Sequence, residues 1–125
     1  MREQCSVIEN KGGGGMKHEA LFRGFIFPEI PNEMCHGSTV LPVGDCVLAA
    51  WFAGSREGED DVAIKVSKFV NGQWRVPQVI KLCSEPHWNP VLTDLGNGKL
   101  ALYFKVGRKI ESWRTMVCYS DNLGD

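Results

Sequence analysis

The chain has 125 residues, a net charge of −1 and 43% hydrophobic residues, which suits one globular domain of ordinary composition. Near-neutral charge excludes the strongly basic class that binds nucleic acid. Apolar runs such as Val47–Ala53 fall far below the roughly 18 residues of a membrane helix, and the N-terminus lacks the apolar region of a signal peptide. We therefore expect a cytoplasmic protein without a nucleic-acid or membrane partner.

The five cysteines form neither a C-x-x-C motif nor a Cys/His ligand pattern. An odd number with this spacing indicates neither a disulfide framework nor a zinc site. The sequence predicts reduced thiols, no metal and no other cofactor.

Residues 1–19 contain four consecutive glycines, Gly12–Gly15. Ordering such a segment is entropically costly, so we predict a flexible leader over 1–19 and a folded domain over 20–125. No G-K-[ST] follows, so the glycines do not match a phosphate loop. The domain is expected to begin with a strand over Leu21–Phe27, followed by a turn bounded by Pro28 and Pro31.

The central stretch alternates apolar runs with turn residues, which is typical of an all-β chain. The predicted strands of this stretch are Ser38–Pro42, Cys46–Ala53, Val62–Phe69 and Trp74–Val79. Asn71-Gly72 is the dipeptide preferred in two-residue hairpin turns. Between the second and third strands lies a charged loop, Gly54–Asp61, in the position where rigid sheets often carry functional groups.

The central unit then recurs. HGSTVLP is answered by HWNPVLT, and LAAWF by LALYF, with a step of 51 residues from His36 to His87 and 52 from Trp51 to Tyr103. A period of about 40–50 residues built from short strands indicates propeller blades. The second repeat predicts strands over Trp88–Thr93, Lys99–Val106 and Trp113–Ser120.

HGSTVLP, WFAGSREGEDDVAI, PHWNPVL and LALYFKVG resemble the sialidase (neuraminidase) superfamily, in its branch of BNR or Asp-box repeat proteins. The resemblance implies a six-bladed β-propeller and a glycosidase that acts on acidic sugars, with carbohydrate as partner. It also implies degenerate Asp boxes at Ser67–Trp74 and from Ser120 to Asp125, whose side chains cap the backbone amides of their own turns.

A six-bladed ring needs about 250 residues at this period. The chain supplies about two blades, so we expect an incomplete propeller from a longer enzyme or a truncated gene product. Open blade edges would also permit self-association.

The resemblance implies a site with three arginines on the sugar carboxylate, an acid/base Asp from a first-blade loop, and a Tyr/Glu pair from later blades. His36 stands where the family has its first arginine, in an R-I-P segment. Arg56 falls at the second arginine. Glu59, Asp60 or Asp61 falls at the acid/base position, and Asp61 is the predicted catalytic residue.

Further substrate-binding candidates come from their place in the repeat. Glu57 is predicted to contact sugar hydroxyls, Trp88 and Asn89 to offer a stacking face and an amide, and Lys105, with Arg108 nearby, to attract an anionic sugar.

Each candidate has a structural alternative. The charged loop can be a solvated hairpin loop, His36 can satisfy backbone groups at a strand start, and Glu57 can pair with Arg56. Trp88 can be core packing, and Lys105 can belong to a solvated rim. Two other functions also stay open: a carbohydrate-binding propeller without catalysis, and a lyase or hydrolase for polysaccharides that contain uronic acid.

Overall fold

A computed structural model of the protein describes residues 4–10, 18–29, 31 and 33–125. These residues form an all-β fold of antiparallel strands, as predicted, with one short 3-10 turn and no α-helix among them. The strands are β1 (Gln4–Asn10), β2 (His18–Phe25), β3 (Met34–Val43), β4 (Cys46–Gly54), β5 (Ala63–Val70), β6 (Gln73–Trp74), β7 (Gln78–Ile80), β8 (His87–Gly96), β9 (Lys99–Val106) and β10 (Arg114–Ser120), and the 3-10 turn η1 is Ile110–Ser112. None of the described residues belongs to a helix that could cross a membrane.

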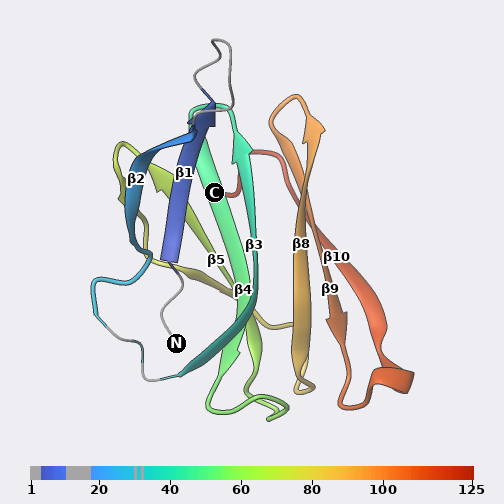
Figure 1. The fold of residues 1–125 in the computed structure, drawn as a ribbon. Helices are drawn as coiled ribbons and strands as arrows, with labels where there is room; N and C mark the ends of the chain where they lie inside the picture. The colour runs from blue at the N-terminus through green and yellow to red at the C-terminus, as the bar shows by residue number, and fades with distance from the viewer. Residues whose placement is uncertain (1–3, 11–17, 30, 32) are drawn as a thin grey trace.

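The first blade is the sheet β3-β4-β5-β6, with β7 also paired to β5 (Figure 1). Its predicted hairpin turn is confirmed, because Asn71 and Gly72 both have positive φ, 53° and 79°. The prediction of one continuous outer strand over Trp74–Val79 is wrong, because this segment is divided into β6 and β7. Pro77 lies in the gap, and proline has no N–H to donate to a ladder.

The second blade is the sheet β8-β9-β10. Its first strand, β8, lies beside β3 and runs in the same direction (Figure 1), as the innermost strands of successive propeller blades do. The described chain thus contains two blades, the second with three strands, and the predicted propeller class is confirmed at that level.

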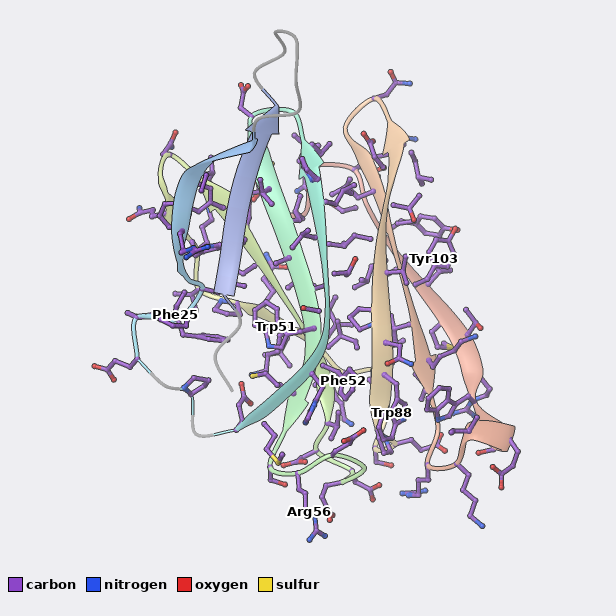
Figure 2. The ribbon with its side chains drawn as sticks, in the orientation of Figure 1. Phe25, Trp51, Phe52, Arg56, Trp88 and Tyr103 are labelled. Atoms are coloured by element: carbon purple, nitrogen blue, oxygen red, sulfur yellow. The ribbon has the colours of Figure 1, made fainter. Side chains whose placement is uncertain are left out.

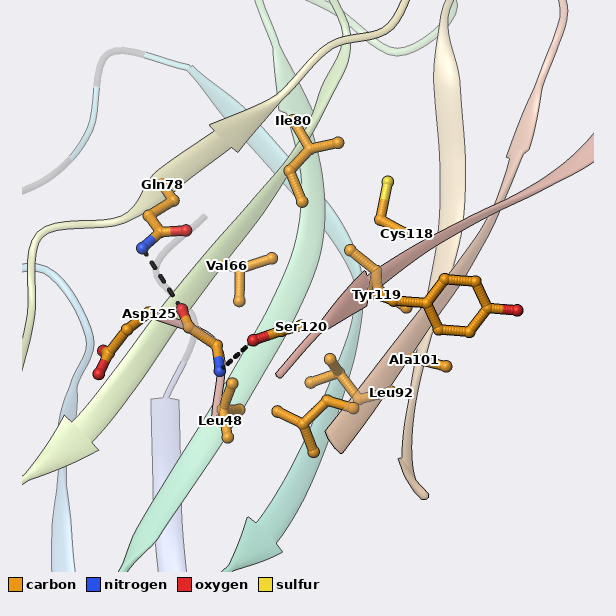
Figure 3. Close-up of a pocket in the computed structure, with 13 residues that line it drawn as sticks. Leu48, Val66, Gln78, Ile80, Leu92, Ala101, Cys118, Tyr119, Ser120 and Asp125 are labelled. Carbon is orange, nitrogen blue, oxygen red and sulfur yellow. Dashed lines mark hydrogen bonds between the residues drawn. The ribbon is translucent and has the colours of Figure 1, made fainter. Parts of the chain in front are cut away.

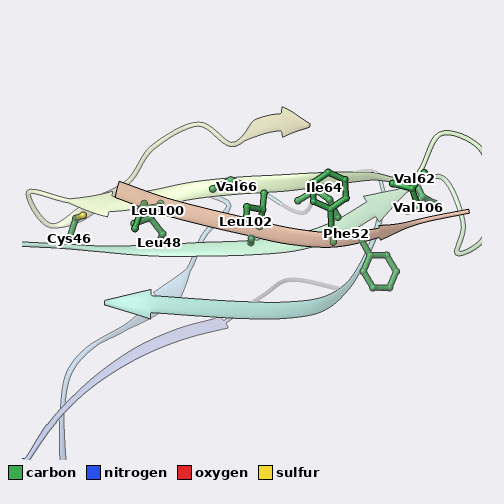
Figure 4. Close-up of a cluster of buried hydrophobic side chains, with 11 residues drawn as sticks. Cys46, Leu48, Phe52, Val62, Ile64, Val66, Leu100, Leu102 and Val106 are labelled. Atoms are coloured by element: carbon green, nitrogen blue, oxygen red, sulfur yellow. The ribbon is translucent and has the colours of Figure 1, made fainter. Parts of the chain in front are cut away.

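Two clusters of buried side chains hold the sheets together. The inter-blade core joins the two blades (Figure 4) and consists of Cys46, Leu48, Ala50, Phe52, Val62, Ile64, Val66, Leu100, Leu102, Phe104 and Val106. The outer core covers the opposite face of the first blade and consists of Ile26, Cys35, Ala49, Trp51 and Ala53. Strand β4 supplies alternate residues to both clusters, so it is the central strand of the fold.

The predicted leader lies partly outside the described residues, which omit 1–3 and 11–17. Within it, β1 pairs with β2 as a two-stranded antiparallel sheet, and β2 corresponds to the strand expected over Leu21–Phe27. The pairing of β1 with β2 gives no information on mobility, so the flexibility of residues 1–19 and the domain boundary at residue 20 stay predictions.

The start of each blade has the same irregularity in its ladder. The register shifts between His36 and Thr39 in the first blade and between Trp88 and Val91 in the second. The residue directly after His36 or Trp88 has a positive φ: 60° at Gly37 and 48° at Asn89. His36 therefore corresponds to Trp88, and the predicted alignment of His36 with His87 is wrong by one residue, because the bulge and not the imidazole fixes the strand start.

The middle strands differ from the sequence alignment in another way. Leu48, Ala50 and Phe52 of β4 lie in the inter-blade core, and so do the residues 52 positions later in β9. Successive blades of a propeller have the same orientation. A β4 residue that faces the second blade therefore corresponds to a β9 residue whose side chain points away from the first blade. A second register shift, between Asp94 and Gly96, adds the extra residue, and the structural step along this strand is 53, from Ala50 to Tyr103.

Candidate functional site

The charged loops of both blades lie at one end of the sheets, where β3 and β8 begin (Figure 2). We call this region the loop end and define it as residues 55–62, 81–86 and 107–113. It lies where the polypeptide passes from β4 to β5, from β7 to β8 and from β9 to β10. Of the strands that flank it, β4, β5 and β9 are largely buried, so the loops rest on a rigid base.

A bidentate ion pair joins the two blades at the loop end. Arg108 Nε and Nη2 donate to Asp60 Oδ1 and Oδ2, both at 2.9 Å. The hydrogen bond from Arg108 lowers the pKa of Asp60, and the same bond raises the pKa of Arg108. The charged loops predicted from the repeat therefore contact each other, through a pair that the sequence did not identify.

Arg56 points into solvent, with 74% of its side chain exposed, and pairs with Glu59 of its own loop (Figure 2). The structural alternative predicts a pair between Glu57 and Arg56, but in the structure the partner of Arg56 is Glu59. Glu57 itself is exposed. The two arginines of the loop end each hold a carboxylate of this chain in the described structure.

Lys81 fastens the loop of the first blade to the linker between the blades. Its Nζ donates to the carbonyl oxygens of Asp60 at 2.5 Å, Val62 at 2.8 Å and Glu85 at 2.8 Å. Partial burial lowers the pKa of Lys81, but three carbonyl acceptors match the three donors of an ammonium group. Sequence reasoning missed this residue, because an isolated lysine in a linker gives no pattern.

The Asp61 carboxylate closes its own loop. Asp61 Oδ2 accepts a hydrogen bond from the Ser55 N–H at 3.0 Å, and hydrogen bonds from the Ser55 side chain and backbone lower the pKa of Asp61. A lowered pKa keeps the carboxyl ionised, whereas a general acid must carry a proton. The catalytic role of Asp61 stays a prediction, and the observed contact is that of a loop cap.

The two histidines have different surroundings. His87 is completely buried, its Nε2 accepts the Leu82 N–H at 2.9 Å and its Nδ1 faces the Glu85 carbonyl at 2.8 Å. The ring is therefore neutral with Nδ1 as donor, and burial lowers its pKa. His36 stacks on Phe52, with ring centroids 5.6 Å apart, and its buried Nε2 has no hydrogen-bond partner among the described residues.

Trp88 is half-buried beside the loop end (Figure 2). Its ring packs between Phe52 and Trp113, with centroids 5.5 and 5.4 Å away, and its Nε1 donates to the Gly107 carbonyl at 2.7 Å. These contacts are those of the packing alternative. Sugar stacking on the remaining surface stays a prediction.

Asn89 and Lys105 lie on the second blade, at the ends of β8 and β9 that meet the loop end, and the Asn89 side chain lies near Gly37 of the first blade. There they line a hollow of about 300 Å³ together with Val91, Tyr103, Phe104 and Thr115. Lys105 Nζ donates to Thr115 Oγ1 at 2.5 Å. The predicted site residues thus fall into two groups, one on the loops themselves and one beside this hollow.

A smaller cavity of about 150 Å³ lies between the blades, far from the charged loops (Figure 3). Its wall is largely apolar and includes Leu48, Val66 and Leu102, and Gly124 closes one side. Ser120 Oγ accepts the Gly124 N–H at 2.8 Å, which confirms that the second Asp box caps its own turn. In the first box, Ser67 Oγ instead donates to the Arg75 carbonyl at 2.6 Å, so that box joins β5 to the segment that follows β6.

Comparison with known proteins gives one match. A family model described as a BNR repeat-like domain matches residues 45–125, and this repeat type is found in sialidase-like β-propellers. No curated protein and no solved structure matches the chain.

Proposed function

This chain belongs to the BNR repeat-like family, and from that premise we propose that its loop end binds an acidic sugar as part of a sialidase-like glycoside hydrolase. In this proposal Arg56 binds the sugar carboxylate and Glu57 accepts hydrogen bonds from sugar hydroxyls. His36 lies behind them at the start of β3, and Asp61 acts as the acid/base group.

One observation carries the proposal: the charged loops of two successive blades converge at one end and are held together by Asp60 and Arg108. A guanidinium group matches a carboxylate in shape and charge. Arg56 is the more exposed of the two arginines, and its present partner, Glu59, is exposed as well: 74% of the Arg56 side chain and 46% of the Glu59 side chain are exposed. Exposed pairs of this kind contribute about 0–1 kcal/mol, so a sugar carboxylate can replace Glu59.

The test is binding and turnover of acidic glycosides by the full chain. We expect N-acetylneuraminate or glucuronate to bind in saturation-transfer NMR, and Arg56→Met to weaken that binding at least tenfold. Arg75→Met is the matched control, because Arg75 is also exposed and also paired, but with Asp125, away from the loop end. Equal loss in both variants, or no binding of either sugar to the wild type, would contradict the proposal.

A second function, sugar binding without hydrolysis, is favoured by the Asp61 contact. A carboxylate that accepts the Ser55 amide and has a lowered pKa is suited to hold a loop and poorly suited to donate a proton near neutral pH. This alternative predicts sugar retention on a glycan array without product release. Release of free sugar that Asp61→Asn abolishes would instead establish the hydrolase.

A further inference from the structure

We propose that Asn71 is a site of spontaneous deamidation, and that the isoaspartate formed there loosens the outer strand β6 of the first blade. The site is the exposed hairpin turn Asn71-Gly72 between β5 and β6. The sequence contains a second Asn-Gly pair, Asn97-Gly98, in the turn between β8 and β9. The two turns share their chemistry and differ in how firmly the surrounding structure holds them.

Deamidation needs an asparagine whose side-chain amide can be reached by the next backbone nitrogen. The Gly72 nitrogen attacks Asn71 Cγ and loses its proton, and the side-chain nitrogen leaves as ammonia, so that a cyclic imide remains. Water then opens the imide: cleavage of the new C–N bond gives aspartate, whereas cleavage of the original peptide C–N bond gives isoaspartate, whose main chain runs through Cβ. Glycine has no Cβ to hinder the attack, and asparagine is one of the thermolabile residues of proteins.

The Asn71-Gly72 turn has free space around it. Both residues are exposed, and among the described residues no atom lies within 4 Å of the position that a Gly72 Cβ would occupy. The strand that follows, β6, consists of Gln73–Trp74, which pair with β5. A turn that closes so short a strand can open without breaking many hydrogen bonds, and an open turn lets the Gly72 nitrogen approach Asn71 Cγ.

The Asn97-Gly98 turn is held more firmly. The strands that it joins, β8 and β9, have 10 and 8 residues. The Gly98 carbonyl also accepts the Leu123 N–H at 3.2 Å, which fastens the turn to the second Asp box. Opening this turn disturbs a longer ladder and breaks that hydrogen bond, so Asn97 should deamidate more slowly than Asn71.

The reaction changes the first Asp box, Ser67–Trp74. Isoaspartate adds one backbone carbon to a two-residue turn, and such a turn fixes the register of the strands that it joins. Trp74 packs against the outer core, with its ring centroid 5.3 Å from that of Phe69. Isoaspartate therefore releases Trp74 from these contacts, whereas aspartate tolerates positive φ and keeps the turn.

The experiment incubates the full chain at mildly alkaline pH and follows its asparagines by peptide mass spectrometry. Each deamidation raises the mass of a peptide by about 1 Da. In the folded chain we expect the Asn71 peptide to convert several times faster than the Asn97 peptide, and we expect this advantage to be lost in urea, where neither turn exists. Asn89 is the internal control, because the next residue, Pro90, has no backbone N–H.

The rates decide whether Asn71 is the site. A faster conversion of Asn71 in the folded chain, with the advantage lost in urea, supports the proposal. Conversion of Asn97 as fast as that of Asn71 in the folded chain, or conversion of Asn71 in urea alone, overturns it.

The effect on the sheet is measured by amide hydrogen exchange as isoaspartate accumulates. Asn71→Gly is the matched control, because it cannot react and still accepts a φ of 53°. We expect exchange at Gln73 and Trp74 to increase with the isoaspartate content in the wild type and to stay constant in Asn71→Gly. Exchange that stays constant in both chains overturns the loosening of β6.

Discussion

The two blades contain nearly the same five-residue segment in their middle strands, yet its burial differs. Trp51 of LAAWF is 0% exposed, whereas Tyr103 of LALYF is 38% exposed. Among the described residues the first blade has a packed cluster on each face, and the second blade contributes to the inter-blade core. The structural step along this strand is 53, so Trp51 corresponds to the buried Phe104, whereas Tyr103 corresponds to Ala50 and lies on the other face of its sheet. The difference teaches that burial follows the face on which a side chain lies, because one extra residue exchanges the two faces of nearly the same segment.

The largest effect should come from the aromatic residues of this comparison. We expect Trp51→Ala to lower the free energy of unfolding by about 3–5 kcal/mol, since it removes the largest side chain of the outer core and leaves a cavity. Tyr103→Ala should cost about 1 kcal/mol or less, because the ring is partly solvated already. Urea denaturation of both variants measures the difference, and similar costs would show that the outer face of the second blade is also covered.

The bulges at the blade starts offer a second test. A Cβ at Gly37 would lie 2.6 Å from a Phe52 ring carbon, and φ is 60°, so Gly37→Ala should destabilise the chain by about 1–3 kcal/mol. The corresponding Asn89→Gly should change stability by less than about 0.5 kcal/mol, because glycine accepts φ 48°. Thermal melts of the two variants would contradict the proposed equivalence if Gly37→Ala were neutral.

The buried histidine should give the second blade its own pH dependence. The pKa of folded His87 lies below its ordinary value of 6.5 because of burial, so the unfolded chain binds the proton more readily. Its stabilising effect is present above pH 6.5 and is lost as the pH falls towards and through the folded pKa, by at most about 1.4 kcal/mol per pH unit.

Denaturation curves between pH 7 and pH 5 measure this loss. His87→Gln should flatten the profile in that range, whereas His36→Gln serves as the matched control at the start of the first blade. A profile that keeps its slope in His87→Gln would show that other groups cause it.

The smallest effect should come from the linker that joins the two sheets. Lys81→Met removes an ammonium that donates to Asp60, Val62 and Glu85 carbonyls, and because water can reach the freed oxygens we expect a cost of about 1 kcal/mol. Amide hydrogen exchange should increase in residues 55–62 and 81–86 and stay unchanged in β10. Uniform exchange in the variant would contradict a local role for Lys81.

Sequence patterns predicted what depends on short-range chemistry. Alternation located most strands, and Asn71-Gly72 defined its hairpin turn because few dipeptides accept two positive φ angles. The division of the outer strand at Pro77 could have been found from the same rules. Family membership, and with it the sialidase-like propeller class, followed from the charged loop and the repeated apolar runs.

The candidate site was less accessible to sequence reasoning. Asp60 and Asp61 are neighbours of the same type, but one pairs with Arg108 across the blades and the other caps its own loop. Which carboxylate does which depends on the path of the loop, and no periodicity encodes that path. The sequence also did not show which side chains of β9 lie on which face, because a single extra residue moves every side chain of a strand to the other face of the sheet.

The second shift in β8, between Asp94 and Gly96, also determines how the blades can be recombined. A β9 segment placed in the first blade at the alignment step of 52 would turn towards the second blade the side chains that face the first blade in their own sheet, whereas a step of 53 would keep each side chain on its face. The interchangeable part of this protein is therefore a strand pair together with its irregularity.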